Sequence, residues 1–390
     1  MATTVNAVQT KSRWSSLIIG FVLIIVAAQL FPLLHIRIDG FVENRVLAQR
    51  PSFPKHFREW RGLADRWDAY LTDNFAPRAF IISHLNYARY LMGYSGSNKI
   101  IVGRDGWLFF DNGNHLAQFS GKLTLSDLEV SNWVAGFKER VAYLNGNGIQ
   151  FYMMIGPVKE DMYPEHRPSW MPSIRVDNEV DRIARAMSDA GIDRLIDPRA
   201  QLFAVKAARP LWDEYDTHWS GWGAYVGYKT LVDRISHDFP DIKAYPQSYF
   251  NTIQHNIPSR EEDLGGMLGI GRFLNQDRMS YGLADWNGQA KTTYLTDRHN
   301  WTAPLVIDTP SKSGRTLLLM RDSFSTELLP LLEANFSRLI VSHVQDGFFR
   351  DDLIRKYHPD VVVLEVIESG ARFTMDPMQS QIQAIHDPIR

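Results

Sequence analysis

The last third of the chain alternates short, almost fully apolar segments with segments of helical character. Residues 316–320 (TLLLM), 339–344 and 360–367 (DVVVLEVI) are predicted to be strands, and residues 325–336 a helix between the first two. Strands that are apolar on both faces are typical of a parallel sheet covered by helices on both sides. This pattern predicts an α/β fold.

The same pattern begins further upstream, where helical periodicity and short apolar runs again alternate. The expected helices cover residues 125–144, 177–190, and a segment beginning at Ser220. The expected strands cover residues 100–102, 107–110, 149–155 and 194–196, and a turn-rich stretch at 240–310 is interpreted as an insertion. Closer to the N-terminus, Phe57, Trp60, Leu63, Trp67 and Leu71 follow the three-and-four spacing of one amphipathic helix.

Residues 14–34 (WSSLIIGFVLIIVAAQLFPLL) carry no charge and would span about one hydrocarbon core as a helix. Lys11 and Arg13 precede them, so the positive-inside rule leaves a short tail in the cytoplasm and exports the rest. We expect an uncleaved, single-pass anchor in the inner membrane. The alternative is a signal peptide cleaved after the small residues of 26–28.

This interpretation divides the chain into three parts. Residues 1–36 form the tail and anchor, residues 37–99 a helical segment, and residues 100–390 an exported domain that contains the insertion.

Composition excludes several classes of protein. The 390 residues include no cysteine, which rules out disulfides, thiolate catalysis and cysteine-ligated metals. A net charge of −2 provides no basic field for nucleic acid. Walker A, dinucleotide-binding and HExxH motifs do not occur in the sequence, so we predict neither a cofactor nor a metal.

Ser323 carries the sharpest chemical signal, because Arg321-Asp322-Ser323 joins a predicted strand to a predicted helix. Ligands bind beyond the carboxyl ends of strands in α/β sheets, and a helix N-terminus offers N–H groups to an oxyanion. A nucleophilic serine fits this position. An Asp or Ser at such a junction is, however, more often a helix N-cap, and position alone favours that alternative.

Asp216 and His218 supply the second signal, because residues two apart in an extended segment point to the same side. An imidazole that is oriented by a carboxylate is the base that a serine nucleophile needs. The alternative is a surface loop in which the histidine is incidental. A third segment, residues 156–164, follows a predicted strand and contains Lys159 and Tyr163, which could contact an anionic or polyhydroxylated substrate.

Four features together resemble the exported, SGNH-hydrolase-like alginate O-acetyltransferase family of the AlgJ and AlgX type. They are the N-terminal apolar segment and the motifs GRDGWLFF (103–110), YDTHW (215–219) and RDSF (321–324). The resemblance implies an SGNH-like parallel sheet with helices on both faces. Because the Asp-His pair precedes the serine in the chain, it also implies a rearranged topology.

The resemblance implies Ser323 as nucleophile, His218 as base and Asp216 as the acid that orients the base. Arg321 replaces the glycine of the usual Gly-Asp-Ser block. We expect four residues to contact substrate: Lys159, Tyr163, Trp219 and Arg321.

The resemblance further implies a membrane-anchored O-acetyltransferase that modifies an alginate-like or cellulose-like exopolysaccharide. A membrane-bound O-acyltransferase partner would supply the acetyl group. Two alternatives stay open at this point. The same triad in an acetylesterase would use water as the acceptor, and a polysaccharide-binding subunit would not use Ser323 at all.

Overall fold

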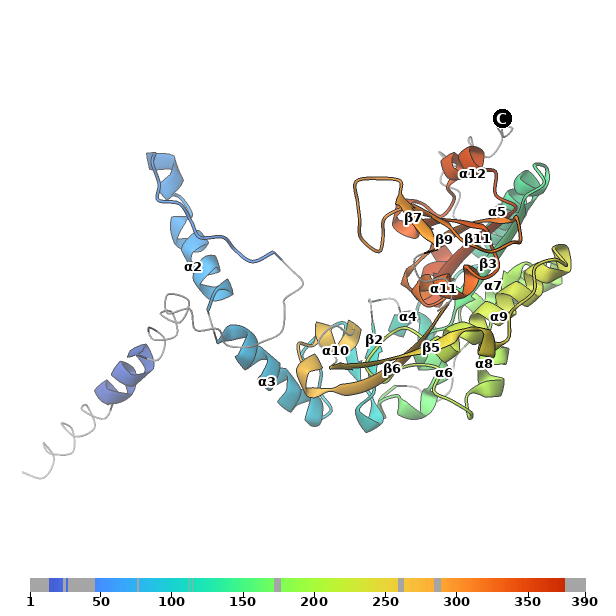
Figure 1. The fold of residues 1–390 in the computed structure, drawn as a ribbon. Coiled ribbons are helices and arrows are strands. Elements are labelled where there is room, and N and C mark those ends of the chain that lie inside the picture. The colour runs from blue at the N-terminus through green and yellow to red at the C-terminus, as the bar shows by residue number, and fades with distance from the viewer. Residues whose placement is uncertain are drawn as a thin grey trace, which may run out of the picture. The chain divides into compact units, whose positions relative to one another are not determined.

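The computed structural model describes residues 14–23, 26, 46–75, 77–111, 113, 115–171, 177–258, 263–283 and 289–375 (Figure 1). The chain divides into two units. The first contains residues 1–97 and 258–275, and the second contains residues 98–257 and 276–390. The 258–275 segment therefore groups with the N-terminal part and not with the residues that flank it in the sequence.

The expected membrane anchor is described only in part. Residues 14–23 are helical, whereas residues 24, 25 and 27–34 lie outside the described residues. Within the described ranges, no helix has both the length and the apolar character needed to cross a membrane.

After the helical residues 14–23, the first unit contains a short 3₁₀ helix, Phe57–Trp60, followed by helix α2 (Leu63–Asp73). The prediction of one continuous amphipathic helix here is wrong. Gly62 has a φ of 67° and interrupts the helix, since a left-handed backbone conformation ends helical geometry and suits glycine.

Helix α3 (Arg78–Leu91) packs against the 263–273 segment of the same unit. That segment contains helix α10 (Asp263–Met267) and the 3₁₀ turn Gly271–Phe273. Ser83 Oγ donates to the carbonyl of Gly269 at 2.5 Å, and the ring of Tyr87 stacks on Phe273.

The second unit is built on a seven-stranded sheet with the order β4-β3-β11-β9-β10-β8-β7. The first five strands are parallel, as predicted, whereas β8 and β7 run antiparallel at one edge and make the sheet mixed. The strands are β3 (Gln150–Gly156), β4 (Leu195–Ile196), β7 (Lys291–Tyr294), β8 (Leu305–Asp308), β9 (Thr316–Arg321), β10 (Arg338–His343) and β11 (Val361–Ile367).

The edge hairpin corrects the interpretation of residues 240–310 as an insertion of turns and loops. Strands β7 and β8 lie in this stretch and extend the main sheet. Strands β5 (Asn251–Pro258) and β6 (Asn275–Gly282) form a separate two-stranded sheet. The polar sequence concealed β5, β6 and β7 because they lie at the edge of the main sheet or outside it, where a strand needs no continuous apolar run.

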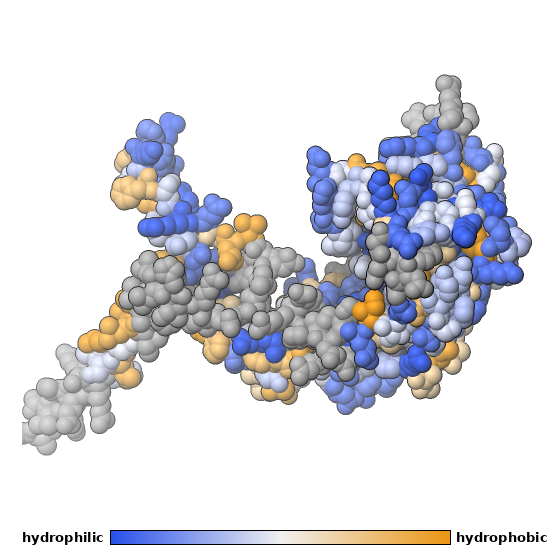
Figure 2. Space-filling model, viewed as in Figure 1, coloured by the Kyte–Doolittle hydropathy of each residue, from blue (hydrophilic) through white to orange (hydrophobic). Residues whose placement is uncertain are grey.

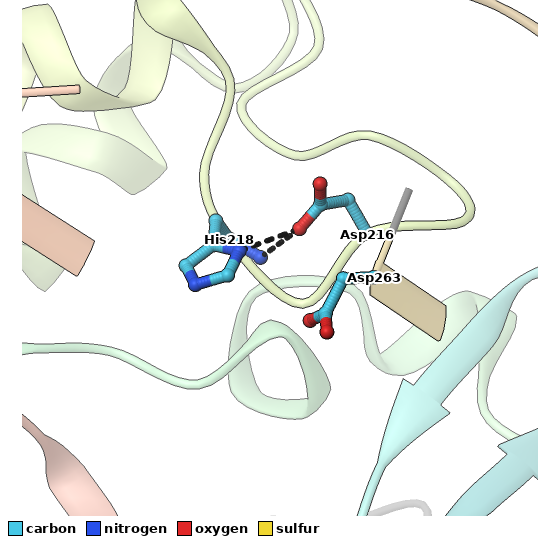
Figure 3. A group of neighbouring side chains, drawn as sticks. All are labelled: Asp216, His218 and Asp263. Atoms are coloured by element: carbon cyan, nitrogen blue, oxygen red, sulfur yellow. Dashed lines mark hydrogen bonds and ion pairs between the residues drawn. The ribbon is translucent and has the colours of Figure 1, made fainter. Parts of the chain in front are cut away.

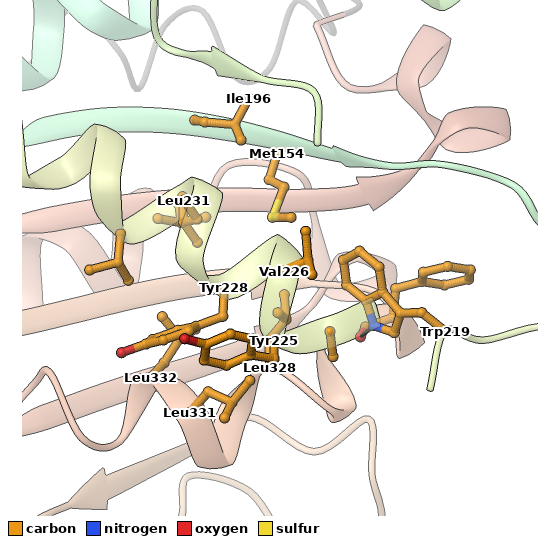
Figure 4. Close-up of a cluster of buried hydrophobic side chains, with 14 of the residues drawn as sticks. Met154, Ile196, Trp219, Tyr225, Val226, Tyr228, Leu231, Leu328, Leu331 and Leu332 are labelled. Atoms are coloured by element: carbon orange, nitrogen blue, oxygen red, sulfur yellow. Dashed lines mark hydrogen bonds between the residues drawn. The ribbon is translucent and has the colours of Figure 1, made fainter. Parts of the chain in front are cut away.

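Alternate residues of the central strands enter two different cores, because successive side chains point to opposite faces of a sheet. Tyr152 and Met154 of β3 belong to one buried cluster, whereas Phe151 and Met153 belong to the other. Helices α9 (Gly221–Asp238) and α11 (Leu329–Leu332) supply the first cluster, which is shown in Figure 4. The prediction of helices on both faces is confirmed.

The second core is covered by α5 (Asp127–Asn145) and α7 (Glu179–Asp189). Capping boxes begin both helices, through Ser126 with Glu129 and Asn178 with Asp181. The remaining helices are α4 (His115–Phe119), α6 (Lys159–Met162), α8 (Arg199–Val205) and α12 (Asp351–Tyr357). Hydrophilic residues make up most of the visible surface of this unit (Figure 2).

The GRDG motif forms the predicted turn between two short antiparallel strands, β1 (Ile100–Val102) and β2 (Leu108–Phe110). Asp105 and Gly106 both have positive φ, 56° and 83°. Only a residue tolerant of that conformation fits such a turn.

Candidate active site

Asp216, His218 and Ser323 converge in the second unit. His218 Nδ1 lies 2.7 Å from Asp216 Oδ1, and His218 Nε2 lies 2.8 Å from Ser323 Oγ. Figure 3 shows the carboxylate of Asp216 turned toward the imidazole. This is the geometry in which a carboxylate orients a base and the base accepts a proton from a hydroxyl.

Ser323 begins the 3₁₀ turn Ser323–Thr326, directly beyond the carboxyl end of β9. Asp322, and not Ser323, is the N-cap, because its Oδ1 accepts a hydrogen bond from Phe324 N at 2.9 Å. Its Oδ2 accepts another from Ile367 N at 2.7 Å, which ties the turn to the end of β11. The aspartate therefore caps the turn and leaves the serine hydroxyl to His218.

The loop that carries the other two residues ends where α9 begins. Asp216 Oδ1 accepts a hydrogen bond from the backbone N–H of His218 as well as contacting its ring, which fixes the spacing of the pair. Trp212 Nε1 donates to the carbonyl of Thr217, and Ser220 caps α9. The loop itself therefore holds the imidazole in position, independently of the contact with Ser323.

Arg278, on β6, contacts the carboxylate of Asp216 from the other side. Its Nη1 lies 3.2 Å from Asp216 Oδ2, and its Nη2 lies 2.7 Å from Glu327 Oε1. Burial raises the pKa of Asp216, but hydrogen bonds from His218 and the charges of His218 and Arg278 outweigh burial and lower that pKa to about 2. Asp216 is therefore ionised across the whole working pH range.

Asp213 lies in the same loop and behaves in the opposite way. Burial, followed by repulsion from Asp216, raises its pKa to about 7. The two carboxyl groups of one loop are thus held in different states, and Asp216 is the one that keeps its charge beside the imidazole.

A second carboxyl pair lies beneath the nucleophile. Glu365 of β11 is fully buried, and its Oε2 accepts a hydrogen bond from Ser325 Oγ at 2.6 Å. Burial and the neighbouring Asp322 raise the pKa of Glu365 well above its usual value. Burial raises the pKa of Asp322 as well, but hydrogen bonds from two backbone N–H groups oppose this rise, so the proton of the pair resides on Glu365.

Lys159 does not face a substrate, which corrects our prediction of a binding role. Its side chain is buried at 2% exposure and lies against Trp107 and Phe109. The ammonium group donates hydrogen bonds to three backbone carbonyls, those of Asp213, Glu214 and Asp216. It therefore holds the loop that carries the triad acid.

Tyr163 and Trp219 need the same correction, because both side chains are buried and bind backbone atoms. Tyr163 Oη accepts a hydrogen bond from Leu211 N, close to the same loop. Trp219 Nε1 donates to the carbonyl of Phe324 at 2.9 Å. Trp219 therefore connects the loop of His218 to the turn that carries Ser323.

Arg321 is the fourth residue that was expected to bind substrate, and it too is buried. Its Nη1 donates to the carbonyl of Asp322 and to Thr326 Oγ1, and its Nη2 donates to the carbonyl of Trp301 at 2.8 Å. The arginine that replaces the usual glycine thus braces the nucleophile turn against the β7–β8 loop.

The sequence interpretation missed Arg278 and Glu365. Arg278 lies in the stretch interpreted as an insertion, 62 residues from its partner Asp216. Glu365 offered a signal, since it is the one charged side chain inside the apolar run 361–367. A buried carboxyl in a central strand needs a partner, and a nearby functional site often provides one.

We expect Arg278→Ala to lower the rate of any reaction that uses Ser323 as nucleophile by up to about a hundredfold, because a small displacement of a catalytic group has effects of this size. Arg278 lowers the pKa of Asp216, so its removal raises that pKa, and the deficit should grow as the pH falls. Rate–pH profiles of the wild type, Arg278→Ala and Arg278→Lys test this. The lysine variant should recover part of the rate, and a deficit that is constant with pH would contradict the electrostatic role.

The imidazole of His218 uses both ring nitrogens, one on Asp216 and one on Ser323. The chemistry of this arrangement is that of an activated hydroxyl nucleophile.

Residues 100–363 match the family described as "SGNH hydrolase-like domain, acetyltransferase AlgX". Two curated relatives carry the name "Probable alginate O-acetylase AlgJ". The protein from Pseudomonas aeruginosa is 33% identical over 149 residues and that from Pseudomonas fluorescens 28% over 175 residues, which is 37% and 44% of this chain. The alignments span only 34% and 42% of those relatives.

Among solved structures, Bacillus cereus PatB1 with a sulfonyl adduct is similar in fold, with a TM-score of 0.52 at 13% identity. The match covers 70% of this chain and 97% of that one. The family match covers more than half of the chain and includes all three residues of the triad. This chain belongs to the SGNH hydrolase-like family of the acetyltransferase AlgX type.

Proposed function

We propose that the protein is an O-acetyltransferase that moves an acetyl group through Ser323 onto hydroxyls of an alginate-like or cellulose-like exopolysaccharide. The observation that carries the proposal is the convergence of Asp216, His218 and Ser323 within hydrogen-bonding distance. The names of the curated relatives, which refer to alginate O-acetylation, support the choice of substrate.

The reaction has two steps. Ser323 Oγ attacks the carbonyl carbon of the acetyl donor while His218 Nε2 takes the hydroxyl proton, and the departing donor group then receives that proton. In the second step a sugar hydroxyl attacks the acyl-enzyme, and His218 takes its proton. The ester bond to Ser323 breaks, and the proton returns to Ser323 Oγ. Asp216 stabilises the imidazolium that forms in each step.

We further propose that residues 14–34 anchor the protein in the inner membrane, with the catalytic part in the periplasm. The uncharged apolar segment after Lys11 and Arg13 supports this arrangement. A membrane-bound O-acyltransferase would then present the acetyl donor from the same membrane.

The test uses the full chain in detergent with a chromogenic acetyl ester, followed by intact mass and peptide mapping. We expect an added acetyl group on the peptide that contains Ser323. Addition of a mannuronate oligosaccharide should then remove the acetyl group and give an acetylated sugar. An adduct on another residue, or none from a folded protein, would contradict the mechanism.

The same experiment separates transfer from hydrolysis, because the two differ only in which acceptor reaches the acyl-enzyme. Loss of the adduct to water at a rate that the oligosaccharide does not change would favour an acetylesterase. The assembled triad argues against a subunit that only binds polysaccharide, since such a subunit has no need of an oriented base.

A further inference from the structure

Trp301 is an exposed tryptophan at the edge of the sheet where Ser323 lies. Its side chain is 56% exposed, whereas Trp107, Trp212 and Trp219 are buried. It precedes β8, which runs antiparallel to β10 and pairs Leu305 with Val341. The residues before β8 therefore lie at the carboxyl end of β10.

The ring of Trp301 is fixed by residues from the ends of two neighbouring strands. His343, the last residue of β10, packs edge-on against it at 4.8 Å between centroids. Arg321, the last residue of β9, lies 5.9 Å from its centroid and also donates to its carbonyl. Arg321 and His343 are register partners in the sheet, so both contacts come from one point of this edge.

Arg321 also connects Trp301 to the turn that carries the nucleophile. Ser323 is two residues beyond Arg321, and two residues span at most about 7 Å of chain. The buried guanidinium that contacts Trp301 donates as well to the carbonyl of Asp322, next to Ser323. One side chain thus links the exposed ring to the backbone of the nucleophile turn.

We propose that Trp301 is a stacking platform for a sugar ring of the acceptor polysaccharide, positioned beside Ser323 by Arg321. This inference rests on the proposed function and extends it to acceptor binding. The flat apolar face of a sugar ring, lined by C–H groups, matches the face of an indole, whose π-system attracts partial positive charge. A ring that is already held on one side loses little freedom when a ligand covers the other.

The platform also explains why this chain has arginine at position 321. A glycine there has no side chain with which to hold the β7–β8 loop. Arg321 donates hydrogen bonds to the carbonyls of Trp301 and Asp322 and to Thr326 Oγ1. The same side chain therefore positions both the proposed acceptor site and the nucleophile turn.

The first measurement is calorimetric titration of a mannuronate oligosaccharide into the full-length Ser323→Ala protein in detergent, which binds without turnover. Adding Trp301→Ala to the Ser323→Ala protein should raise the dissociation constant about tenfold, which is the scale of one good aromatic contact. Trp301→Phe should keep most of the affinity because it retains a ring. Trp170→Ala is the matched control, since Trp170 is 62% exposed on the turn that follows the Pro164–His166 helix.

The second measurement is acetyl transfer to the same oligosaccharide. Trp301→Ala should raise the acceptor KM about tenfold and change kcat by less than about threefold, because the ring binds the sugar and takes no part in bond making. A dissociation constant or KM equal to that of the wild type would overturn the platform, as would an equal effect of Trp170→Ala.

The outcomes for platform and proposed function can be told apart. If the oligosaccharide binds and Trp301→Ala weakens binding, but Ser323 never carries an acetyl group, the platform stands and the proposed transferase fails. If Ser323 carries the acetyl group and the oligosaccharide accepts it with a KM that Trp301→Ala leaves unchanged, the transferase stands and the platform fails. Circular dichroism melts establish that each variant is folded.

Discussion

Replacing Ser323 with alanine is expected to abolish the acetyl adduct and lower acetyl transfer by about 10⁴-fold or more. In the proposed mechanism, the Ser323 hydroxyl oxygen is the only atom of the triad that forms a bond to the acetyl carbon. Effects of this size follow loss of the nucleophile when base and nucleophile act as a unit. The measurement is transfer of acetyl to a mannuronate oligosaccharide, with intact mass on the same samples.

Ser236→Ala is the control for this experiment. Ser236 is a half-buried serine of α9 that donates to the carbonyl of Asp233 and contacts no residue of the triad, so its loss should leave the rate unchanged. The fold of Ser323→Ala should also be intact, because Asp322 and not Ser323 caps the turn. Adduct formation in a folded Ser323→Ala protein would show that another residue is the nucleophile.

Asp216→Asn has the second-largest expected effect, a fall in kcat on the order of 10³–10⁴-fold. The amide that replaces the carboxylate can donate a hydrogen bond to His218 Nδ1, which places the proton of the neutral imidazole on Nε2. Nε2 then has no free lone pair with which to accept the proton of Ser323. The amide also lacks the charge that stabilises the imidazolium. The measurement is the transfer rate of the variant across a range of pH.

The pH dependence distinguishes this role from a structural one. Asp216 has a pKa of about 2, so it is charged at every pH where the enzyme can be assayed, and the deficit of Asp216→Asn should not shrink toward acid. Asp233→Asn, which changes an exposed aspartate paired with Lys229, should have the wild-type profile. A deficit below about tenfold would show that Asp216 does not orient the base.

The central strands could be predicted from the sequence because burial on both faces of the sheet requires apolar residues at consecutive positions, a pattern that few other short segments have. The runs at β3, β9, β10 and β11 are apolar at consecutive positions, and each was predicted within one or two residues of its bounds. The edge hairpin β7–β8 could not be predicted in this way. Strand β7 is the edge strand and every one of its residues is exposed, so its sequence resembles that of a loop, and β8 beside it has only four residues.

The candidate triad could be predicted because its local geometry is short-range. Asp216 and His218 are two residues apart, and Ser323 follows an apolar strand directly. The roles of the four residues that were expected to contact substrate could not be predicted in this way. Polar and aromatic types such as Lys159 and Trp219 suit a binding surface and a buried frame equally well, and only packing distinguishes the two.

The sequence by itself determined which residues form the central strands, which serine begins a turn at a strand end and which histidine has an aspartate beside it. These properties depend on neighbours a few positions away. Tertiary structure alone decided that Arg278 meets Asp216, that Lys159 is buried and that Trp301 lies beside Arg321. The physical reason is that such contacts join residues separated by tens of positions, whose meeting depends on strand order and direction and not on local sequence.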